Sequence, residues 1–270
     1  MPLRMPRRAG VLLKTGQLTQ YSSELDDGFY QAGLLKRYEI LTTGSQSGTV
    51  NIDLIHLTVA TIDFEATTPG TINDSGADLA MFKTGETIVV SGSGSNDGVY
   101  TVSTGNVAGT IRTTEPTLLE AAGATVSIAK REAHSNECVQ DLVTGRMWSR
   151  YTSAQYATMG TGGDGLMPWT GQVYDIFQYA AVANAASLGG YADWRIPNSV
   201  EIHSLSDFES LTWSPDLTAF PTWTVYRIWS STGNAKVPST AMFEDYANNY
   251  VNRNIATTTL CSAALVRGGV

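Results

Sequence analysis

The side chains best suited to binding lie close together near the C-terminal end, in residues 231–259. Amides, phenols and charged groups are frequent there, and antigen- and receptor-binding loops favour such residues because they make adaptable contacts. The predicted ligand contacts are Asn234, Glu244, Asp245, Tyr246, Asn248, Asn249, Tyr250, Asn252 and Arg253. Ordinary solvent-facing strands and loops would have the same composition, so the sequence leaves both interpretations open.

The residue types that carry catalysis are few and scattered. Cys138 and Cys261 form no CxxC unit, and they are either one disulfide or two buried thiols. The run SGSGS from residue 91 has no lysine and no following helix, so it predicts a turn rather than a phosphate-binding loop. No histidine or cysteine cluster has the spacing of a metal site.

The histidines do not form a catalytic group either. Their positions are His56, His134 and His203. His56 falls where the apolar–polar alternation of a predicted strand is interrupted. His134 is expected in a loop. His203 lies near Glu201 and Ser204, but neighbouring positions on a helix point in different directions. We therefore expect no enzyme.

Charge and hydropathy argue against nucleic-acid-binding, membrane-spanning and exported proteins. The chain has 17 basic and 25 acidic residues, a net charge of −8, and four of the basic residues lie in the first fourteen. The acidic remainder repels phosphate backbones, which argues against nucleic acid as a partner. No apolar stretch reaches the roughly 18 residues of a membrane span. The N-terminus also lacks the pattern of a secretory signal, so we expect synthesis in a host cytoplasm without export.

Three regions follow from composition and periodicity. Residues 1–48 contain few periodic signals and predict an extended N-terminal arm. In residues 49–130 apolar and polar side chains alternate with period two, and a hairpin pattern surrounds Asp97 and Gly98. Together these features predict a small all-β module. Residues 131–270 contain all six tryptophans, which indicates an aromatic core.

Two helices are predicted within this last region. The first has an apolar face of Val173, Ile176, Phe177 and Ala180, and it ends at Gly189 and Gly190. The second follows a cap at Asn198 or Ser199 and buries Ile202, Leu205 and Phe208.

Four motifs in order identify the C-terminal region by resemblance. They are VQDLVTGRMWSR, GGYADWRIPNSVEIHSL, the segment that begins IWSST, and LVRGG, spanning residues 139–269. They resemble the Lcl C-terminal domain family, which implies a C-type-lectin-like fold. The residues that the motifs mark as structural are Trp148, Asp193, Trp194, Arg195, Pro197, Trp229 and Arg267. Arg195 can form bidentate hydrogen bonds to a carboxylate, and Asp193 is the expected partner.

The lectin-like fold raises the questions of calcium and of oxidase chemistry. Glu244, Asp245, Asn248, Asn249 and Asp164 could supply some of the six to eight oxygens that calcium needs. The sugar-binding signatures EPN and WND do not occur. Formylglycine-generating oxidases share the fold but need a close cysteine pair, whereas Cys138 and Cys261 lie at opposite ends of the domain. We expect no cofactor, with calcium as the alternative.

The β module resembles modules of tailed-phage virion proteins, on the pattern GETIVVSGSGSNDGVYTVS followed by EAAG. The expected fold class is α+β: an extended N-terminal arm, an all-β module and a C-type-lectin-like domain. The resemblances imply a phage virion surface protein, a tail-fibre or tail-tip adhesin that binds a host cell-surface protein or glycan. The arm and module would contact other virion proteins, and phage adhesins of this kind are commonly homotrimers.

Two alternatives remain open at this point. A structural virion component, such as a capsid decoration or tail-assembly protein, would use the fold as scaffold and bind no receptor. A bacterial cell-surface adhesin would need an export route that the sequence does not show.

Overall fold

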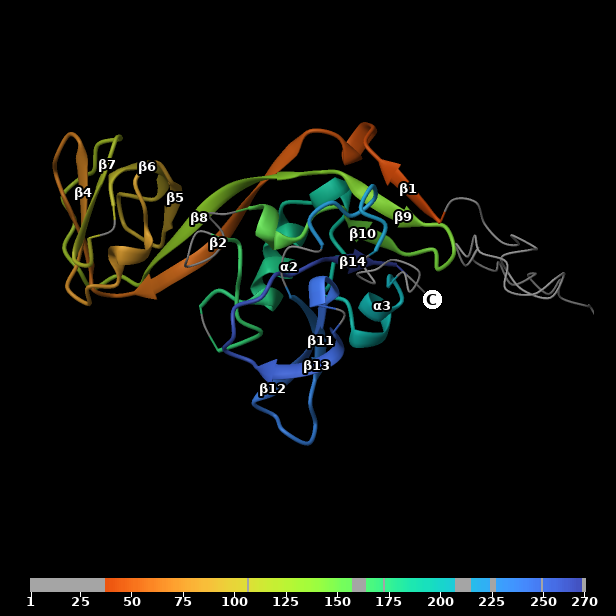
Figure 1. The fold of residues 1–270 in the computed structure, drawn as a ribbon. Helices are drawn as coiled ribbons and strands as arrows, with labels where there is room; N and C mark the ends of the chain where they lie inside the picture. Colours follow the sequence, from red (N-terminus) through yellow and green to blue (C-terminus); the bar gives the residue numbers. More distant parts are fainter. Residues whose placement is uncertain are drawn as a thin grey trace, which may run out of the picture.

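The computed structural model describes residues 37–105, 107–156, 164–171, 173–206, 215–223, 227–248 and 250–268. Residues 1–36 of the predicted N-terminal arm lie outside this range. The described chain is mostly β, with antiparallel sheets and few helices (Figure 1). No helix in the described part is long and apolar enough to cross a membrane.

The first sheet has seven strands in the order β2-β8-β5-β6-β7-β4-β3. The strand bounds are β2 (Thr49–Val59), β3 (Ile62–Glu65), β4 (Gly70–Asp74), β5 (Thr87–Ser91), β6 (Gly98–Thr104), β7 (Thr110–Thr113) and β8 (Val126–Ser135), with the 3-10 turn η2 (Leu79–Met81). β5 and β6 are the predicted hairpin, and they pair antiparallel from Thr87 opposite Thr101. The alternating apolar residues of these strands form one core, which includes Phe64, Phe82 and Ile88.

Two smaller sheets build the C-terminal part. One has the order β1-β9-β10-β14 and the other β11-β12-β13. Their bounds are β1 (Tyr38–Leu41), β9 (Cys138–Asp141), β10 (Met147–Ser149), β14 (Val266–Arg267), β11 (Ile228–Gly233), β12 (Thr240–Asp245) and β13 (Tyr250–Ala256). The helical elements are α2 (Ile176–Ala185), α3 (Ser199–His203), η1 (Gly44–Gln46), η3 (Ser153–Gln155), η5 (Leu188–Gly190) and η6 (Tyr246–Asn248).

The strands β2 and β8 form a long ribbon that belongs to both parts of the molecule (Figure 1). At one end, Leu57 packs in the core of the seven-stranded sheet. At the other, Ile52 and Leu54 are fully buried in the C-terminal core that contains Trp194 and Trp229. The C-terminal part is therefore completed by residues that precede the β module in the chain.

A bulge separates the two halves of this ribbon. The pairing of β2 with β8 shifts between Ile55 and Leu57, and the extra residue is His56. The alternation slip in the sequence marks this position, because an inserted residue reverses which face the following side chains occupy. The buried His56 ring stacks on Tyr174 at 4.5 Å, which attaches the bulge to the C-terminal part.

The helix starting at Ile176 buries a different face from the predicted one. Asp175 caps it by accepting hydrogen bonds from the backbone N–H groups of Phe177 and Gln178. Because the helix starts after this cap, Val173 precedes it and is 47% exposed, and Phe177 is 41% exposed. The buried positions follow the spacing i, i+3, i+4 and i+7 from the first residue: Ile176, Tyr179, Ala180 and Ala183.

The second predicted helix has the expected start. The Asn198 side chain accepts a hydrogen bond from the Glu201 N–H, and the Glu201 carboxylate accepts one from the Asn198 N–H, a complete capping box. Ile202 and Leu205 are buried as predicted, whereas Phe208 lies outside the described residues.

His134 is a buried strand residue, so its predicted place in a loop was wrong. It lies in β8 opposite Val50, and its ring stacks on Tyr156 with centroids 3.4 Å apart. Burial lowers the pKa of His134 to about 3, because the low-dielectric interior disfavours the charged ring.

This burial makes the stability of the protein depend on pH. Between about pH 6.5 and pH 3 the unfolded chain binds a proton that folded His134 does not, so acidification favours unfolding, by up to about 5 kcal/mol. Urea denaturation at several pH values should show the wild type losing more stability than H134F as the pH falls through this window. A difference between the two proteins that stays constant with pH would contradict the expectation.

Candidate binding surface

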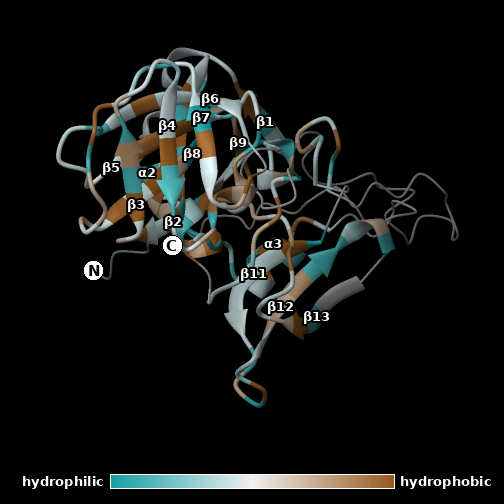
Figure 2. Ribbon diagram, turned by 90° about the vertical axis from the view of Figure 1, so that its left-hand side faces the viewer, coloured by the Kyte–Doolittle hydropathy of each residue, from teal (hydrophilic) through white to brown (hydrophobic). Residues whose placement is uncertain are grey.

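The predicted binding segment folds as the three-stranded sheet β11-β12-β13. Its turn between β11 and β12 projects from the molecule (Figures 1 and 2). Asn234 shapes this turn, because its Oδ1 accepts hydrogen bonds from the N–H groups of Lys236 at 3.0 Å and Val237 at 3.4 Å. The amide oxygen of Asn234 is therefore used within the turn.

Three of the predicted receptor contacts are interior residues. The exposed fractions of Glu244, Asp245 and Tyr246 are 0%, 3% and 1%. Helix α3 packs against this end of β12, with Glu244 Oε1 3.5 Å from His203 Nδ1, and the Tyr246 hydroxyl donates to the Ile202 carbonyl at 2.6 Å. Direct receptor contact through these three side chains is corrected accordingly, since all three are buried.

The buried carboxylate of Asp245 orders the turn after β12. Asn248 donates from Nδ2 to both Asp245 oxygens at 3.0 Å, and Arg227 donates from Nε at 3.4 Å. These contacts use the carboxylate and the amide that were candidates for calcium. Among the residues that the structure describes, no three His, Cys, Asp or Glu side chains are grouped so that they could hold a metal ion.

The side chains that this sheet exposes coincide only in part with the predicted contacts. Arg253 and Asn254 are exposed on β13, which is an edge strand of the three-stranded sheet, and Lys236 and Val237 are exposed at the turn. Asn249 and the side chains of Tyr250 and Asn252 lie outside what the structure describes. We define the candidate binding surface as Lys236, Val237, Asn248, Arg253 and Asn254.

This surface is basic although the protein as a whole is acidic. Lys236 and Arg253 are exposed, whereas Glu244 and Asp245 of the same sheet point into the interior. Glu244 and Asp245 are buried where β12 ends, Glu244 near His203 of α3 and Asp245 paired with Arg227, whereas the turn and the edge strand remain in solvent. The arrangement can bind acidic or hydrogen-bond-accepting groups.

The arginines of the motifs pair with carboxylates, and the pairing differs from the expected one. Arg195 donates to both oxygens of Glu201, at 2.6 and 2.7 Å, and Arg146 adds a third hydrogen bond at 3.0 Å. The predicted partner, Asp193, instead accepts two hydrogen bonds from Arg267 at 2.6 and 3.2 Å. The pairing of Arg195 with Asp193 was therefore wrong.

Glu201 is the framework residue that the sequence reasoning missed. Burial alone would raise its pKa, but hydrogen bonds from Arg195 and the Asn198 N–H hold the pKa below its usual value. A signal existed, because Asn198 followed three residues later by Glu is the pattern of a capping box. A carboxylate at that helix position reaches back toward the preceding strand, where Arg195 lies.

The motif tryptophans are core residues, and two of them donate an indole hydrogen bond to a backbone carbonyl. Trp148, Trp194 and Trp229 are buried. The indole N–H of Trp194 donates to the Leu188 carbonyl at 2.8 Å, and that of Trp229 to the Met167 carbonyl at 3.0 Å. The Pro197 carbonyl accepts from the Ser231 N–H at 2.7 Å, which joins the loop before α3 to β11.

The two cysteines are separate buried thiols, which decides between the alternatives left open by their spacing. Burial raises the pKa of both Cys138 and Cys261 to about 12, so neither is a thiolate near neutral pH. Cys138 packs closely on Gly189, where an added Cβ would lie 2.6 Å from the sulfur. Gly189 also has a φ of +61°, so both space and backbone favour glycine here.

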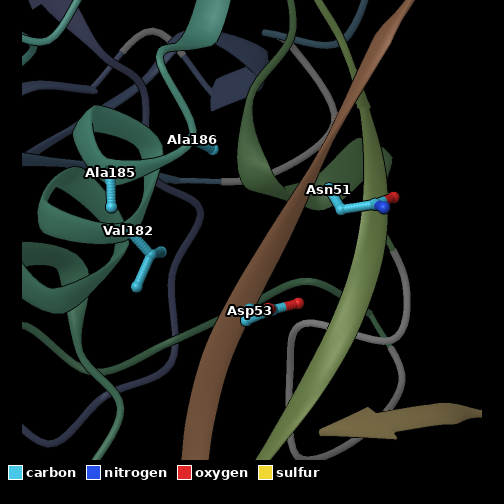
Figure 3. A pocket seen from close by; sticks show the side chains of 5 residues that line it. All are labelled: Asn51, Asp53, Val182, Ala185 and Ala186. Carbon is cyan, nitrogen blue, oxygen red and sulfur yellow. The ribbon is translucent and has the colours of Figure 1, made fainter. Parts of the chain in front are cut away.

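A small pocket of about 210 Å³ lies between α2 and β2, away from the candidate binding surface (Figure 3). Its lining residues are Asn51, Asp53, Val182, Ala185 and Ala186. Both oxygens of Asp53 accept hydrogen bonds from Arg131 at 2.7 Å, so the carboxylate is already paired. The pocket offers one free polar side chain at most and supports no ligand assignment.

Comparison with known proteins bears on the C-terminal part. A search of curated proteins found no match to the chain. The four motifs quoted above fall on β9 and β10, on the segment from η5 to α3, on β11 and on β14. Residues 137–267 match the model of the Lcl C-terminal domain family.

Proposed function

We propose that this protein is a phage virion surface protein, a tail-fibre or tail-tip adhesin that displays a C-type-lectin-like domain for attachment to a host cell. The match of residues 137–267 to the Lcl C-terminal domain supports the lectin-like part. The resemblance of the β5–β6 hairpin region to virion modules supports the location. The N-terminal arm and the β module contact other virion proteins, and the adhesin acts as a homotrimer.

One observation carries the binding proposal: the projecting turn and the edge strand expose Lys236 and Arg253, while the carboxylates of the same sheet are buried. A surface of this kind attracts acidic and hydroxyl-rich groups, which bacterial cell-surface glycans and proteins present. No catalytic step and no cofactor are part of the proposal. The thiols are protonated and buried, and the framework carboxylates are paired with arginine.

The test is binding of the labelled full chain to intact host bacteria. The wild type should attach saturably, and the double variant K236E/R253E should bind at least about tenfold more weakly, because each reversal replaces an attraction with a repulsion. Both residues are exposed, so the melting temperature should change little.

A matched control is R112E, which makes the same charge reversal at an exposed position of β7 on the β module. It should bind like the wild type. Equal weakening by R112E and R253E would show that only net charge matters and would overturn the assigned surface. No saturable attachment of the wild type would favour the alternative, a structural virion component that binds no receptor.

A further inference from the structure

The β module presents two leucines to solvent on the loop between β7 and β8. Leu118 is 60% exposed and Leu119 is 77% exposed. Ala121 and Ala122, which follow Glu120, are exposed as well. Burial removes apolar surface from water and is favourable, so two adjacent exposed leucines favour a covering partner.

The loop cannot turn these leucines inward without losing several hydrogen bonds. The Leu118 N–H donates to Asn96 Oδ1 at 2.8 Å, and Asn96 Nδ2 donates to the Leu118 carbonyl at 3.1 Å. The Glu120 carboxylate accepts from the N–H groups of Gly94 and Ser95, at 2.6 and 2.9 Å. Glu120 also pairs with Phe64 through two backbone hydrogen bonds. The SGSGS turn thus holds the leucine loop in place, and the exposure belongs to the folded state.

The surroundings of the leucines are acidic. Asp97, Glu115 and Glu120 all act on the hydroxyl of Tyr100, whose pKa is raised by burial and by these three negative charges. Residues 57–128 contain eight Asp or Glu and two Lys or Arg. A partner for this patch therefore needs apolar side chains together with positive charge.

A segment of this chain has that composition. Residues 2–14, PLRMPRRAGVLLK, contain four basic and no acidic residues among leucines, valine and methionine. This segment precedes Arg37 and β1, and β1 lies at the end of the molecule opposite to the β module (Figure 1). A contact between the segment of one copy and the patch of another would place the two copies head to tail.

We propose that residues 2–14 of one copy bind the Leu118–Leu119 patch of a second copy. A symmetric contact between two patches would bring like charges together, which is unfavourable. A head-to-tail contact joins unlike surfaces and closes into a ring when the rotation between copies permits. The contact uses neither the candidate binding surface nor a receptor, so it stands independently of the proposed attachment function.

Sedimentation velocity and light scattering of the full chain test the proposal. The wild type should show a mass above that of one chain, rising with concentration and falling with added salt. The patch variant L118S/L119S and the segment variant R4E/R7E/R8E should each remain monomeric. An equimolar mixture of the two should form a 1:1 dimer and nothing larger, because the mixture contains one intact segment and one intact patch per pair.

The control V200S removes an equally exposed apolar side chain on α3, and it should associate like the wild type. Circular dichroism and melting should be unchanged in all variants, since every substituted side chain of the patch is exposed. A monomeric wild type, an associating patch variant, or a mixture that stays monomeric would each overturn the proposal.

Discussion

Residues 131–270 expressed alone should not fold cooperatively, although they contain the whole region that matches the Lcl C-terminal domain. The first reason is β1, which pairs with β9 over four residues and is absent from the shortened chain. Tyr38 of this strand packs edge-on against Phe220 at 5.0 Å, and Arg37 pairs with Asp141 at 2.9 Å.

The second reason is β2. Ile52 and Leu54 are fully buried among the tryptophans of the C-terminal core. Loss of each leaves a cavity that costs about 2–5 kcal/mol, and a typical domain is stable by only about 5–15 kcal/mol. Thermal melting followed by near-ultraviolet circular dichroism should show no cooperative transition for the shortened chain.

A matched chain separates the loss of these strands from the loss of the β module. Ile55 and Ala129 lie directly opposite each other in the β2–β8 ribbon. Replacing residues 56–128 by Asn-Gly therefore closes the ribbon as an ordinary two-residue hairpin. This chain should keep a cooperative transition, because the core of the seven-stranded sheet is removed as a unit. Cooperative melting of residues 131–270 at the temperature of the full protein would contradict the expectation.

Glu201→Ala should be the most damaging single substitution among the charged framework residues, lowering the free energy of unfolding by about 2–4 kcal/mol. The change removes both hydrogen bonds of Arg195, the hydrogen bond of Arg146 and one half of the capping box. Part of the cost is offset because the two arginine side chains are partly exposed, 46% for Arg195 and 24% for Arg146, and regain water.

Asp193→Ala is the matched control for this substitution. Its carboxylate also accepts two hydrogen bonds from an arginine, but the Asp193 side chain is 57% exposed, so the loss should stay below about 1 kcal/mol. Chemical denaturation of the two variants measures the difference. Equal losses of unfolding free energy would mean that burial does not decide how much these ion pairs contribute to stability.

The local signals of the sequence were informative wherever the deciding contacts lie within a few residues. The hairpin of β5 and β6 follows from alternation and a turn around Asp97 and Gly98, because strand pairing across a short turn is a local event. The cap at Asn198 follows from side-chain chemistry three residues long. Even the bulge at His56 is visible as a slip in alternation.

The helix from Ile176 shows what the local sequence pattern did not predict correctly, namely its first residue and its buried face. The spacing of apolar residues was sufficient to predict a helix, but the residue at which it starts sets its buried face. Asp175 set that start by capping, and Phe177 consequently faces solvent. A shift of one position rotates an α-helix by about 100°, which is enough to exchange the buried and exposed sides.

The sequence by itself determined the β-rich character, the two capped helices, the hairpin of the module and the C-terminal family motifs. Tertiary structure decided which carboxylate Arg195 binds, and it buried Glu244, Asp245 and Tyr246 while leaving Lys236 and Arg253 in solvent. It also placed Ile52 and Leu54 in a core formed mostly by residues more than a hundred positions later. Composition and periodicity describe each segment alone, whereas these outcomes depend on which distant elements pack against it.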